Sequence, residues 1–299
     1  MSQALLSEAA NTNQRQIVHQ AIQEISHIAT LPEVTLKIIR LVEDPDSTAR
    51  DLNQVISNDP ALGTRILKVV NSAFYGLPDQ IGSINRAIVL LGLNAVKNIA
   101  IAASLAKLFR GGKICPSFDA RDLWTHCIAV ATGTRLLADK TGLGLPDEAF
   151  LAGLIHDIGI MVEVQARRNQ FVEAIKKLEA DPNLNLRQAE LECIGATHEQ
   201  FGTALCQLWK FPPSFAHVTG YHHDPLQLAD NHRTLASLVH VADILAAKTE
   251  QGFTRSVETI EVDPQLLEQI GLTASQLDEV AGAVPTVTAK ANSLLDQWV

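Results

Sequence analysis

Apolar residues recur at helical spacing along almost the whole chain, and this periodicity limits the possible folds more than any other feature of the sequence. Leu52, Val55 and Ile56 share one helical face, and so do Phe201 and Leu205, because residues three or four apart lie on the same side of an α-helix. No sustained alternation of apolar and polar residues with hairpin dipeptides competes with this pattern. The sequence therefore predicts an all-α fold.

Capping residues and breaks divide the predicted helices. Asp59-Pro60 places an N-capping side chain before a proline at the first helical position, and Ser83 and Gly92 can begin and end a later helix. The segment 111–118, rich in Gly, Lys, Cys, Pro and Ser, interrupts the pattern before a helix that starts near Asp119. We therefore predict an N-terminal helical lobe over residues 1–112, a second helical lobe over 113–252 and a C-terminal helical cap over 253–299.

Composition narrows the class of protein. With 299 residues and 46% hydrophobic content, the chain can bury a large core. Its formal charge of -9, from 24 basic and 33 acidic side chains, disfavours direct binding to nucleic acid. The four cysteines form no C-x-x-C pair, and the N-terminus lacks a basic region followed by an apolar one. We therefore expect a reduced, cytoplasmic protein.

The richest apolar stretch spans residues 90–108, but polar and charged side chains such as Asn94, Lys97 and Lys107 interrupt it. A helix that crosses a bilayer needs about 20 predominantly apolar residues. This stretch is therefore predicted to be a buried helix, and no membrane partner is expected.

Histidine and aspartate residues recur in an order that a metal site can use. The pair His156-Asp157 ends an apolar, helix-forming run, and a second pair, His222-His223, ends a later predicted helix. Neutral imidazole and carboxylate are ligands that Zn, Mn and Fe prefer, and no thiolate is required. The candidate metal ligands are His126, His156, Asp157, His198, His222, His223 and Asp243.

A lone histidine on a helix is more often a core or surface residue than a ligand. We assign that role to His19, His27, His217, His232 and His240. The adjacent pairs differ because they come from separate helix ends, and Asp157 can bridge two cations while histidines of different helices complete each coordination sphere. The expected cofactor is a divalent metal, two ions of Fe, Mn or Zn. Asp122, four residues before His126, is either an orienting carboxylate or a solvated helix-start residue.

The order of a lone histidine, His-Asp, a further histidine, His-His and a final aspartate resembles the HD superfamily of metal-dependent phosphohydrolases, and especially its HD-GYP branch of cyclic-di-GMP phosphodiesterases. The chain is still more similar to the HDOD family in the segments DPAL at 59–62, ILKVVNSAFYG at 66–76 and IGSINRAIVLLG at 81–92. This resemblance covers about residues 25–247. It implies an HD-domain, phosphodiesterase-like helical bundle with an N-terminal helical lobe, found in bacterial signalling and regulatory proteins.

Part of the resemblance lies in a block that admits two interpretations. Asn71 and Ser72, followed by Phe74 and Tyr75, can form a recognition surface. The alternative, which we favour, is that the polar pair satisfies backbone groups at a helix end while the aromatic rings pack.

Two departures from the phosphodiesterase pattern bear on activity. Those relatives carry a lysine three positions after the Asp of the His-Asp pair, where this chain has Ile160, and they follow the double histidine with a glutamate and a Gly-Tyr-Pro motif, where this chain reads Asp224-Pro225-Leu226. Stabilising the charge that develops in the transition state is often the largest catalytic contribution. The missing cation therefore weakens the prediction of hydrolysis even if the metal ions bind, so metal binding and catalysis are separate predictions.

Three functions follow from the resemblance. The first is a bacterial signal-transduction module that retains a dinuclear metal site and acts through signalling proteins or a small phosphorylated ligand. The second is a phosphohydrolase with Asp157 as the bridging, catalytic carboxylate; His126, His156, Asp157 and Asp243 then hold one ion, and His198, His222 and His223 hold the other. The third is a diiron oxygenase, which would not need the lysine.

Overall fold

The computed structural model describes residues 3–25, 32–71, 77, 79–109, 111–142 and 146–295. The first half of the chain forms α1 (Gln3–Glu24), α2 (Glu33–Glu43), α3 (Ala49–Ser57), α4 (Pro60–Val70), α5 (Ile84–Leu91), α6 (Leu93–Leu105), the 3-10 helix η1 (Ala106–Phe109), β1 (Lys113–Cys115), β2 (Phe118–Asp119) and α7 (Ala120–Thr141). The prediction of an all-α fold is confirmed.

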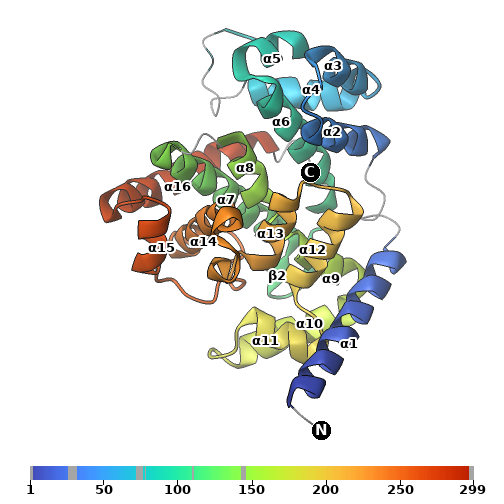
Figure 1. Cartoon of the computed structure of the whole chain (residues 1–299), viewed down its shortest axis with the longest axis vertical. Coiled ribbons are helices and arrows are strands. Elements are labelled where there is room, and N and C mark those ends of the chain that lie inside the picture. Colours follow the sequence, from blue (N-terminus) through green and yellow to red (C-terminus); the bar gives the residue numbers. More distant parts are fainter. Residues whose placement is uncertain are drawn as a thin grey trace.

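After α7, the described residues of the chain form helices only (Figure 1). These are α8 (Pro146–Ile155), α9 (Ile158–Ala166), α10 (Arg168–Ala180), α11 (Leu186–Cys193), α12 (His198–Leu208), α13 (Pro213–Tyr221), the 3-10 helix η2 (Pro225–Gln227), α14 (Asp230–Lys248), α15 (Pro264–Gln269) and α16 (Ala274–Leu295). The predicted loop at 111–118 contains the antiparallel pair β1 and β2. These strands are too short to leave a periodic signal in the sequence.

Several predicted helix ends are confirmed, because the capping side chains satisfy free backbone N–H groups. Asp59 accepts a hydrogen bond from the amide of Leu62 at the start of α4, and Ser83 accepts one from the amide of Arg86 at the start of α5. Gly92 lies between α5 and α6 with a φ of 90°. This left-handed conformation favours glycine, and it lets the chain turn directly from one helix into the next.

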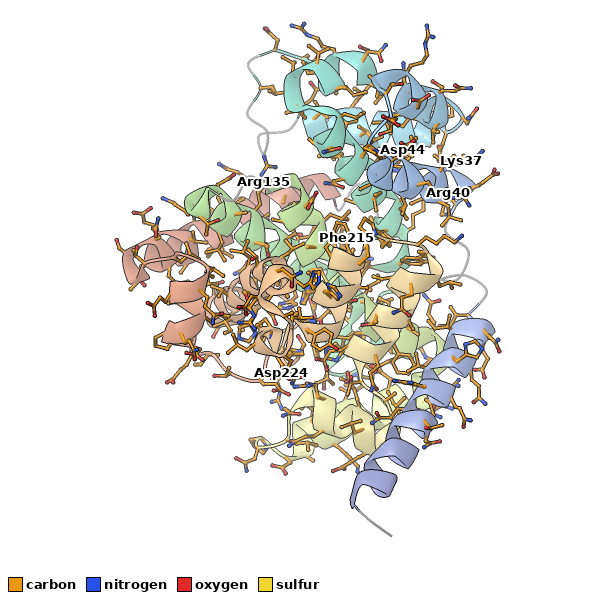
Figure 2. All side chains as sticks on the ribbon, in the orientation of Figure 1. Lys37, Arg40, Asp44, Arg135, Phe215 and Asp224 are labelled. Carbon is orange, nitrogen blue, oxygen red and sulfur yellow. The ribbon has the colours of Figure 1, made fainter. Side chains whose placement is uncertain are left out.

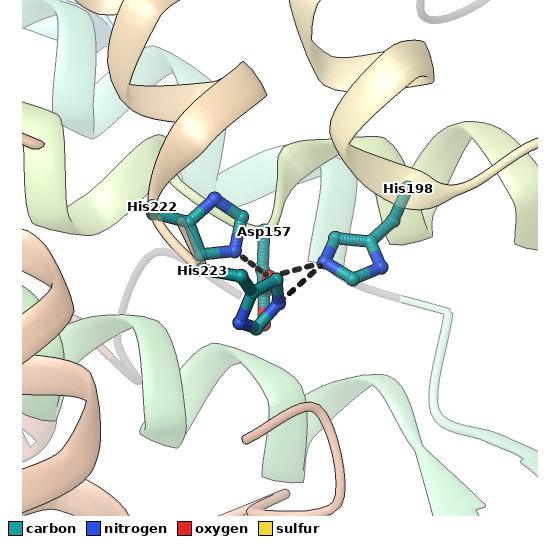
Figure 3. Close-up of side chains that lie close together, drawn as sticks. All are labelled: Asp157, His198, His222 and His223. Carbon is teal, nitrogen blue, oxygen red and sulfur yellow. Dashed lines mark hydrogen bonds and ion pairs between the residues drawn. The ribbon is translucent and has the colours of Figure 1, made fainter. Parts of the chain in front are cut away.

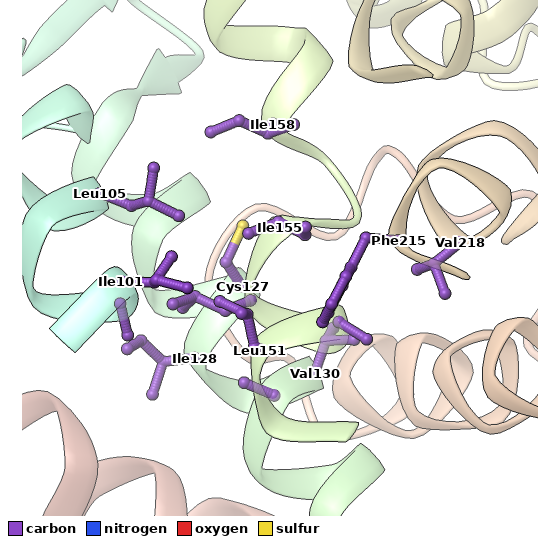
Figure 4. Packing of buried hydrophobic residues seen from close by; sticks show 14 of the residues in the cluster. Ile101, Leu105, Cys127, Ile128, Val130, Leu151, Ile155, Ile158, Phe215 and Val218 are labelled. Atoms are coloured by element: carbon purple, nitrogen blue, oxygen red, sulfur yellow. The ribbon is translucent and has the colours of Figure 1, made fainter. Parts of the chain in front are cut away.

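The centre of the molecule is built around α7, which packs against α8, α14 and α16. A Cβ atom on Gly153 of α8 would lie 2.7 Å from the Cα of Ala131 on α7, so only glycine permits this close approach. Figure 4 shows the packing at this contact, where Cys127 of α7 lies beside Ile155 and Ile128 lies toward Ile101 of α6. The α8 helix is thus pressed onto α7 next to the His156-Asp157 pair.

The helices α2, α4 and α5 pack on α6. Every residue of α6 from Ala95 to Leu105 is buried, so the predicted buried helix within residues 90–108 is confirmed. Lys97 is held in this interior by the carbonyl oxygen of Leu41 at 2.5 Å and the hydroxyl of Ser47 at 2.6 Å.

One segment, Glu148–Ala166, is long and apolar enough to cross a membrane, but 89% of it is buried inside the protein. It comprises most of α8 and all of α9. Such extensive burial is typical of a segment in the core of a folded domain.

The remaining helices enclose the centre. α1 lies across α9 and α12, and α15 and α16 lie at the opposite side of the molecule in Figure 1. The division at residues 112 and 252 stays a prediction. In the block that resembles the HDOD pattern, the side chain of Asn71 donates to the carbonyl oxygens of Leu67 and Ile81, as the structural interpretation predicts; Ser72, Phe74 and Tyr75 lie outside the described residues.

Candidate metal centre

The structure brings all seven predicted ligands together from five segments of the chain. His126 lies within α7, His156 and Asp157 occupy the junction of α8 and α9, and His198 is the first residue of α12. The other three are His222 and His223, which follow α13, and Asp243 of α14. All are buried, and the most exposed is His223, at 8% of its surface.

Asp157 lies between two groups of imidazoles, and Figure 3 shows it with one of them, His198, His222 and His223. Its Oδ1 atom is 3.3 Å from Nε2 of His222 and 3.5 Å from Nε2 of His198. Its Oδ2 atom is 3.3 Å from Nε2 of His156 and 3.9 Å from Nε2 of His126. Each carboxylate oxygen therefore faces a different pair of rings, which is the arrangement that a bridging carboxylate requires.

Two further contacts complete the groups. Oδ1 of Asp243 lies 2.9 Å from Nε2 of His126 and 3.8 Å from Nε2 of His156. On the other side of Asp157, the Nε2 atoms of His198 and His223 are 3.1 Å apart. Three overlapping groups of these side chains can hold a metal ion. Two of them share Asp157, one with His198, His222 and His223 and one with His126 and His156, and the third, His156, His222 and Asp243, spans the two.

The unpaired polar atoms test whether a metal fits this donor set. Both oxygens of Asp157, Oδ1 of Asp243 and the Nε2 atoms of His126, His156 and His222 are buried and lie close to one another, but none of them makes a hydrogen bond of acceptable geometry. A buried polar atom left unpaired costs about 1–3 kcal/mol, and more if it is charged. Cations held between these atoms would remove that cost, so the residues fit a centre for divalent metals such as Zn, Mn or Fe.

Backbone carbonyls orient two of the rings. Nδ1 of His156 lies 2.7 Å from the carbonyl oxygen of Gly153, and Nδ1 of His222 lies 3.2 Å from that of Val218. A ring that donates its Nδ1 proton to a carbonyl keeps the lone pair on Nε2. Both rings thus present Nε2 to Asp157.

Gly159, at the start of α9, lets two of the ligand-bearing segments meet. A Cβ atom at this position would overlap the carbonyl oxygen of His198 and lie 2.7 Å from the amide nitrogen of Gly202. With a side chain there, α12 could not rest on α9 at this distance. The glycine therefore holds His198 within reach of Asp157.

Glu190 of α11 also takes part, although no pattern in the sequence indicates it. Its two oxygens lie 2.8 and 2.9 Å from Nδ1 of His198, and one accepts a hydrogen bond from the backbone amide of His198. Acidic residues are common on helices, and an interval of eight residues between different helices has no periodic meaning.

Contacts among the carboxylates and imidazoles of the centre determine the protonation of Asp157 and His198. Burial opposes ionisation of Asp157, but His156, His222 and His198 outweigh it and hold the pKa of this carboxyl well below its usual range. Burial likewise opposes a charged His198, yet Glu190, Asp157 and Glu199 raise its pKa to about 10. Without metal, a proton on His198 therefore balances carboxylate charge, and a cation bound to this ring must displace it.

His223 differs from the other rings in this respect. Burial and the neighbouring rings of His222 and His198 lower its pKa well below the usual value. A neutral imidazole offers a lone pair at neutral pH, so His223 can act as a ligand without first losing a proton.

Arg187 of α11 forms ion pairs with two residues that directly follow predicted ligands. Its side chain lies 2.8 Å from Glu199, which follows His198, and 3.0 Å from Asp224, which follows His223. It also lies 3.4 Å from Glu258 in the segment after α14. Figure 2 shows Asp224 on the side of the molecule that faces α11.

The histidines that the sequence set aside have separate positions. His19 and His232 are exposed, and the rings of His217 and His232 lie 4.9 Å apart, away from the centre. His240 is not incidental, because its Nδ1 atom lies 2.7 Å from the carbonyl oxygen of His222 and fixes the backbone there. Its position three residues before Asp243 on one helical face was the available signal.

The two remaining sequence assignments can be stated briefly. His27 lies outside the described residues. Asp122 is exposed, as its solvated interpretation predicts, and its backbone carbonyl accepts a hydrogen bond from the amide of Phe253.

Comparison with known proteins identifies the family. A family model described as "HDOD domain" matches residues 28–225, about two thirds of the chain. The chain belongs to the HDOD family. The HDOD chain is also 27% identical over 223 residues to an uncharacterized protein of Treponema pallidum (strain Nichols); the match covers 74% of this chain and 42% of that protein. It thus spans less than half of that relative's length.

Solved structures share the fold. An HDOD domain protein with unknown function from Geobacter sulfurreducens has a TM-score of 0.81 to the HDOD chain at 23% identity, over 95% of this chain and 98% of that one. A protein of Shewanella amazonensis SB2B named "Putative phosphohydrolase" has a TM-score of 0.73 at the same identity and coverage. At this identity the likeness establishes the common helical architecture.

Proposed function

We propose that this HDOD chain is a regulatory signalling module that holds two divalent cations in its candidate metal centre. The observation that carries the proposal is the position of Asp157, whose two oxygens each face separate imidazoles in a fully buried site. In the proposed assignment, His126, His156 and Asp243 hold one ion, His198, His222 and His223 hold the other, and Asp157 bridges them.

The residues around the centre favour regulation over hydrolysis. A bound metal would supply Lewis acidity that polarises a phosphoryl oxygen. Ile160, at the position of the lysine in phosphodiesterase relatives, is fully buried within the hydrophobic core. Arg187, which is also near the centre, forms ion pairs with Glu199, Asp224 and Glu258. Because these carboxylates neutralise its charge, it is not available to bind a phosphate.

A phosphohydrolase is the second candidate, and the completeness of the ligand set supports it. Seven donors from five segments exceed what one four-coordinate structural ion uses. In that case Asp157 would be the catalytic residue, since two of the three groups of donors share it. In the regulatory module, the output would pass to a signalling protein, and a small phosphorylated ligand would act on the centre.

Metal analysis tests the proposal. Protein purified without added metal and analysed by inductively coupled plasma mass spectrometry should contain nearly two ions per chain. His223→Ala should lower that content, whereas His217→Ala should leave it unchanged, because His217 pairs with His232 away from the centre. Equal metal content in both variants would contradict the assignment.

The same preparation separates the two candidate functions. A screen against bis(p-nitrophenyl) phosphate and cyclic dinucleotides, with Fe, Mn or Zn supplied, should give little or no turnover if the module is regulatory. Turnover that disappears in Asp157→Asn would instead establish the phosphohydrolase.

A further inference from the structure

Two buried glutamates lie behind the candidate centre without belonging to its ligand set. Glu163 of α9 and Glu190 of α11 are both fully buried. Charged carboxylates are almost never fully buried without a partner. Two apolar side chains could be buried here at a lower free-energy cost, so we expect the two glutamates to have a function beyond packing.

The partner of the Nδ1 atom differs between His198 and two of the other rings. The Nδ1 atoms of His156 and His222 face neutral backbone carbonyls. The Nδ1 atom of His198 instead faces both oxygens of Glu190, at 2.8 and 2.9 Å. A carboxylate behind an imidazole fixes its tautomer and makes the opposite nitrogen a stronger donor to a metal than a carbonyl does.

Glu163 stands behind Glu190 in turn. Glu190 is the nearest charged group that acts on Glu163, and neither oxygen of Glu163 receives a hydrogen bond from a protein donor. Burial, and then the neighbouring charge of Glu190, raise the pKa of Glu163 well above its usual value. Two adjacent buried carboxyl groups share one charge, so Glu163 carries a proton and donates it to Glu190.

We infer that Glu190 positions His198, and Glu163 positions Glu190, as a relay that sets the affinity of one of the two cation sites. The relay runs from the Glu163 hydroxyl through the Glu190 carboxylate and the His198 ring to Nε2, which lies 3.5 Å from Oδ1 of Asp157. The inference rests on the proposed dinuclear centre. It predicts that the two ions are held unequally, since Nδ1 of His126 has no hydrogen-bond partner and Nδ1 of His156 faces only a backbone carbonyl.

The geometry also distinguishes the relay from a third metal site. The Nδ1 atom of His198 is occupied by Glu190, and neither glutamate shares a group of donors close enough to hold an ion with the seven ligands. A purely structural tie between α9, α11 and α12 is the simpler rival. Apolar side chains of similar volume usually serve such a tie equally well or better.

Matched amide substitutions test the relay. Metal-free parent, Glu190→Gln, Glu163→Gln and Glu192→Gln proteins are titrated with Mn²⁺ by isothermal calorimetry. Glu192 is an exposed neighbour on α11 that pairs with Lys177, so its substitution controls for the loss of a negative charge.

Glu190→Gln should weaken one of the two binding events by about 10–100-fold, the usual effect of removing a partner behind a ligand, and leave the other unchanged. Glu163→Gln should bind like the parent, because the amide N–H replaces the hydroxyl as the donor to Glu190. Equal affinities in Glu190→Gln and Glu192→Gln would overturn the inference, as would a loss in Glu163→Gln as large as that in Glu190→Gln. If the parent itself binds fewer than two ions, the proposed function fails instead.

A spectroscopic measurement covers the case in which Glu190→Gln does not fold. In Zn²⁺-loaded parent protein, ¹⁵N-detected imidazole spectra should show His198 bound through Nε2 and protonated on Nδ1. This Nδ1 proton should resonate further downfield than those of His156 and His222, and Glu163→Leu should shift it upfield. A ring bound through Nδ1, or a proton signal that Glu163→Leu does not move, would overturn the relay.

Discussion

Asp157 belongs to two of the three groups of donors, because the interruption between α8 and α9 places its carboxylate between four histidine rings. Burial alone would favour its neutral form, but the surrounding rings keep its pKa low. Without metal, this negative charge is balanced by protons on His156 and His198, whose pKa values the nearby carboxylates raise. With metal, two cations would take over that balance, so the same carboxylate serves both states.

Replacing Asp157 with Asn should therefore have different effects on the two states. In metal-loaded protein, the substitution should lower the melting temperature, because a ligand at a thousand times its dissociation constant adds about 4 kcal/mol of stability that the variant would lose. In protein treated with chelator, the decrease should be much smaller. Differential scanning calorimetry checks this, and an equal decrease with and without chelator would show that Asp157 acts through local packing or charge alone.

The pKa of His198 predicts a pH dependence for the metal-free protein. Its folded pKa of about 10 exceeds the unfolded value of about 6.5. A raised folded pKa means that the bound proton stabilises the fold fully below about pH 6.5, and that this contribution shrinks as pH rises and is lost near pH 10. The free energy of unfolding of His198→Gln, measured by urea denaturation with chelator, should therefore approach that of the parent as pH increases.

A constant difference between parent and His198→Gln across this range would contradict the raised pKa. The comparison with metal present is informative too. A cation displaces the His198 proton, so its apparent affinity should increase with pH over the same interval.

At the residue scale, the candidate ligands could be predicted from the sequence, but the residues that orient them could not. The seven donors were found because histidine and aspartate in this order match one family's pattern. Glu190 and Glu163 could not be found in this way, since their role depends on how α11 and α9 pack behind His198. His240 was set aside because only the structure shows its contact with the His222 backbone.

At the scale of elements, the contact between α9 and α12 decides whether the centre can form. Gly159→Ala would place a methyl group against the backbone of His198. Such overpacking usually costs about 1–3 kcal/mol, and we expect the larger value, since backbone cannot move aside as a side chain can. Metal content should fall along with stability, because His198 is displaced from Asp157.

Gly282→Ala in α16 is the matched control. A Cβ atom there meets nothing within 4 Å, so this helical substitution should be neutral or stabilise the protein by about 0.5–1 kcal/mol. Chemical denaturation and metal analysis of both variants check the prediction. If Gly159→Ala retains the stability and metal content of the parent, the close approach does not control the centre.

Helix ends could be predicted from the sequence where a side chain terminates the backbone hydrogen bonding. Asp59, Ser83 and Asp119 cap the helices that were expected after them. The pair of strands β1 and β2 could not be predicted, because strands of three and two residues give no alternation to detect. Periodicity identifies the apolar face of a helix but not the helix that packs on it. The contact between α12 and α9 therefore could not be predicted from the sequence.

At the scale of the whole molecule, ligands from five segments would let two ions cross-link helices that are otherwise held by packing. The fold class and the order of the ligands could be predicted because both are encoded along the chain. The convergence of α7, α12 and α14 on one point follows from tertiary packing, to which the family resemblance was the only guide.

The whole site also predicts poor hydrolysis of cyclic-di-GMP. Ile160 lies in the core, and the turn η2 with Asp224 replaces the Gly-Tyr-Pro segment of the phosphodiesterases. We expect turnover by metal-loaded protein to lie below the usual enzymatic range, which begins at about 1 per second. Chromatographic assay of the linear product checks this, and faster turnover would show that neither feature limits the chemistry.

Electron paramagnetic resonance of Mn²⁺-loaded protein tests the central claim most directly, because it reports whether two ions share a bridge. The parent should show an exchange-coupled pair of ions at two equivalents of Mn²⁺. Asp157→Asn, titrated in the same way, should show only isolated Mn²⁺. An isolated-ion spectrum in the parent, or the same coupled spectrum in Asp157→Asn, would contradict a centre in which Asp157 joins two cations.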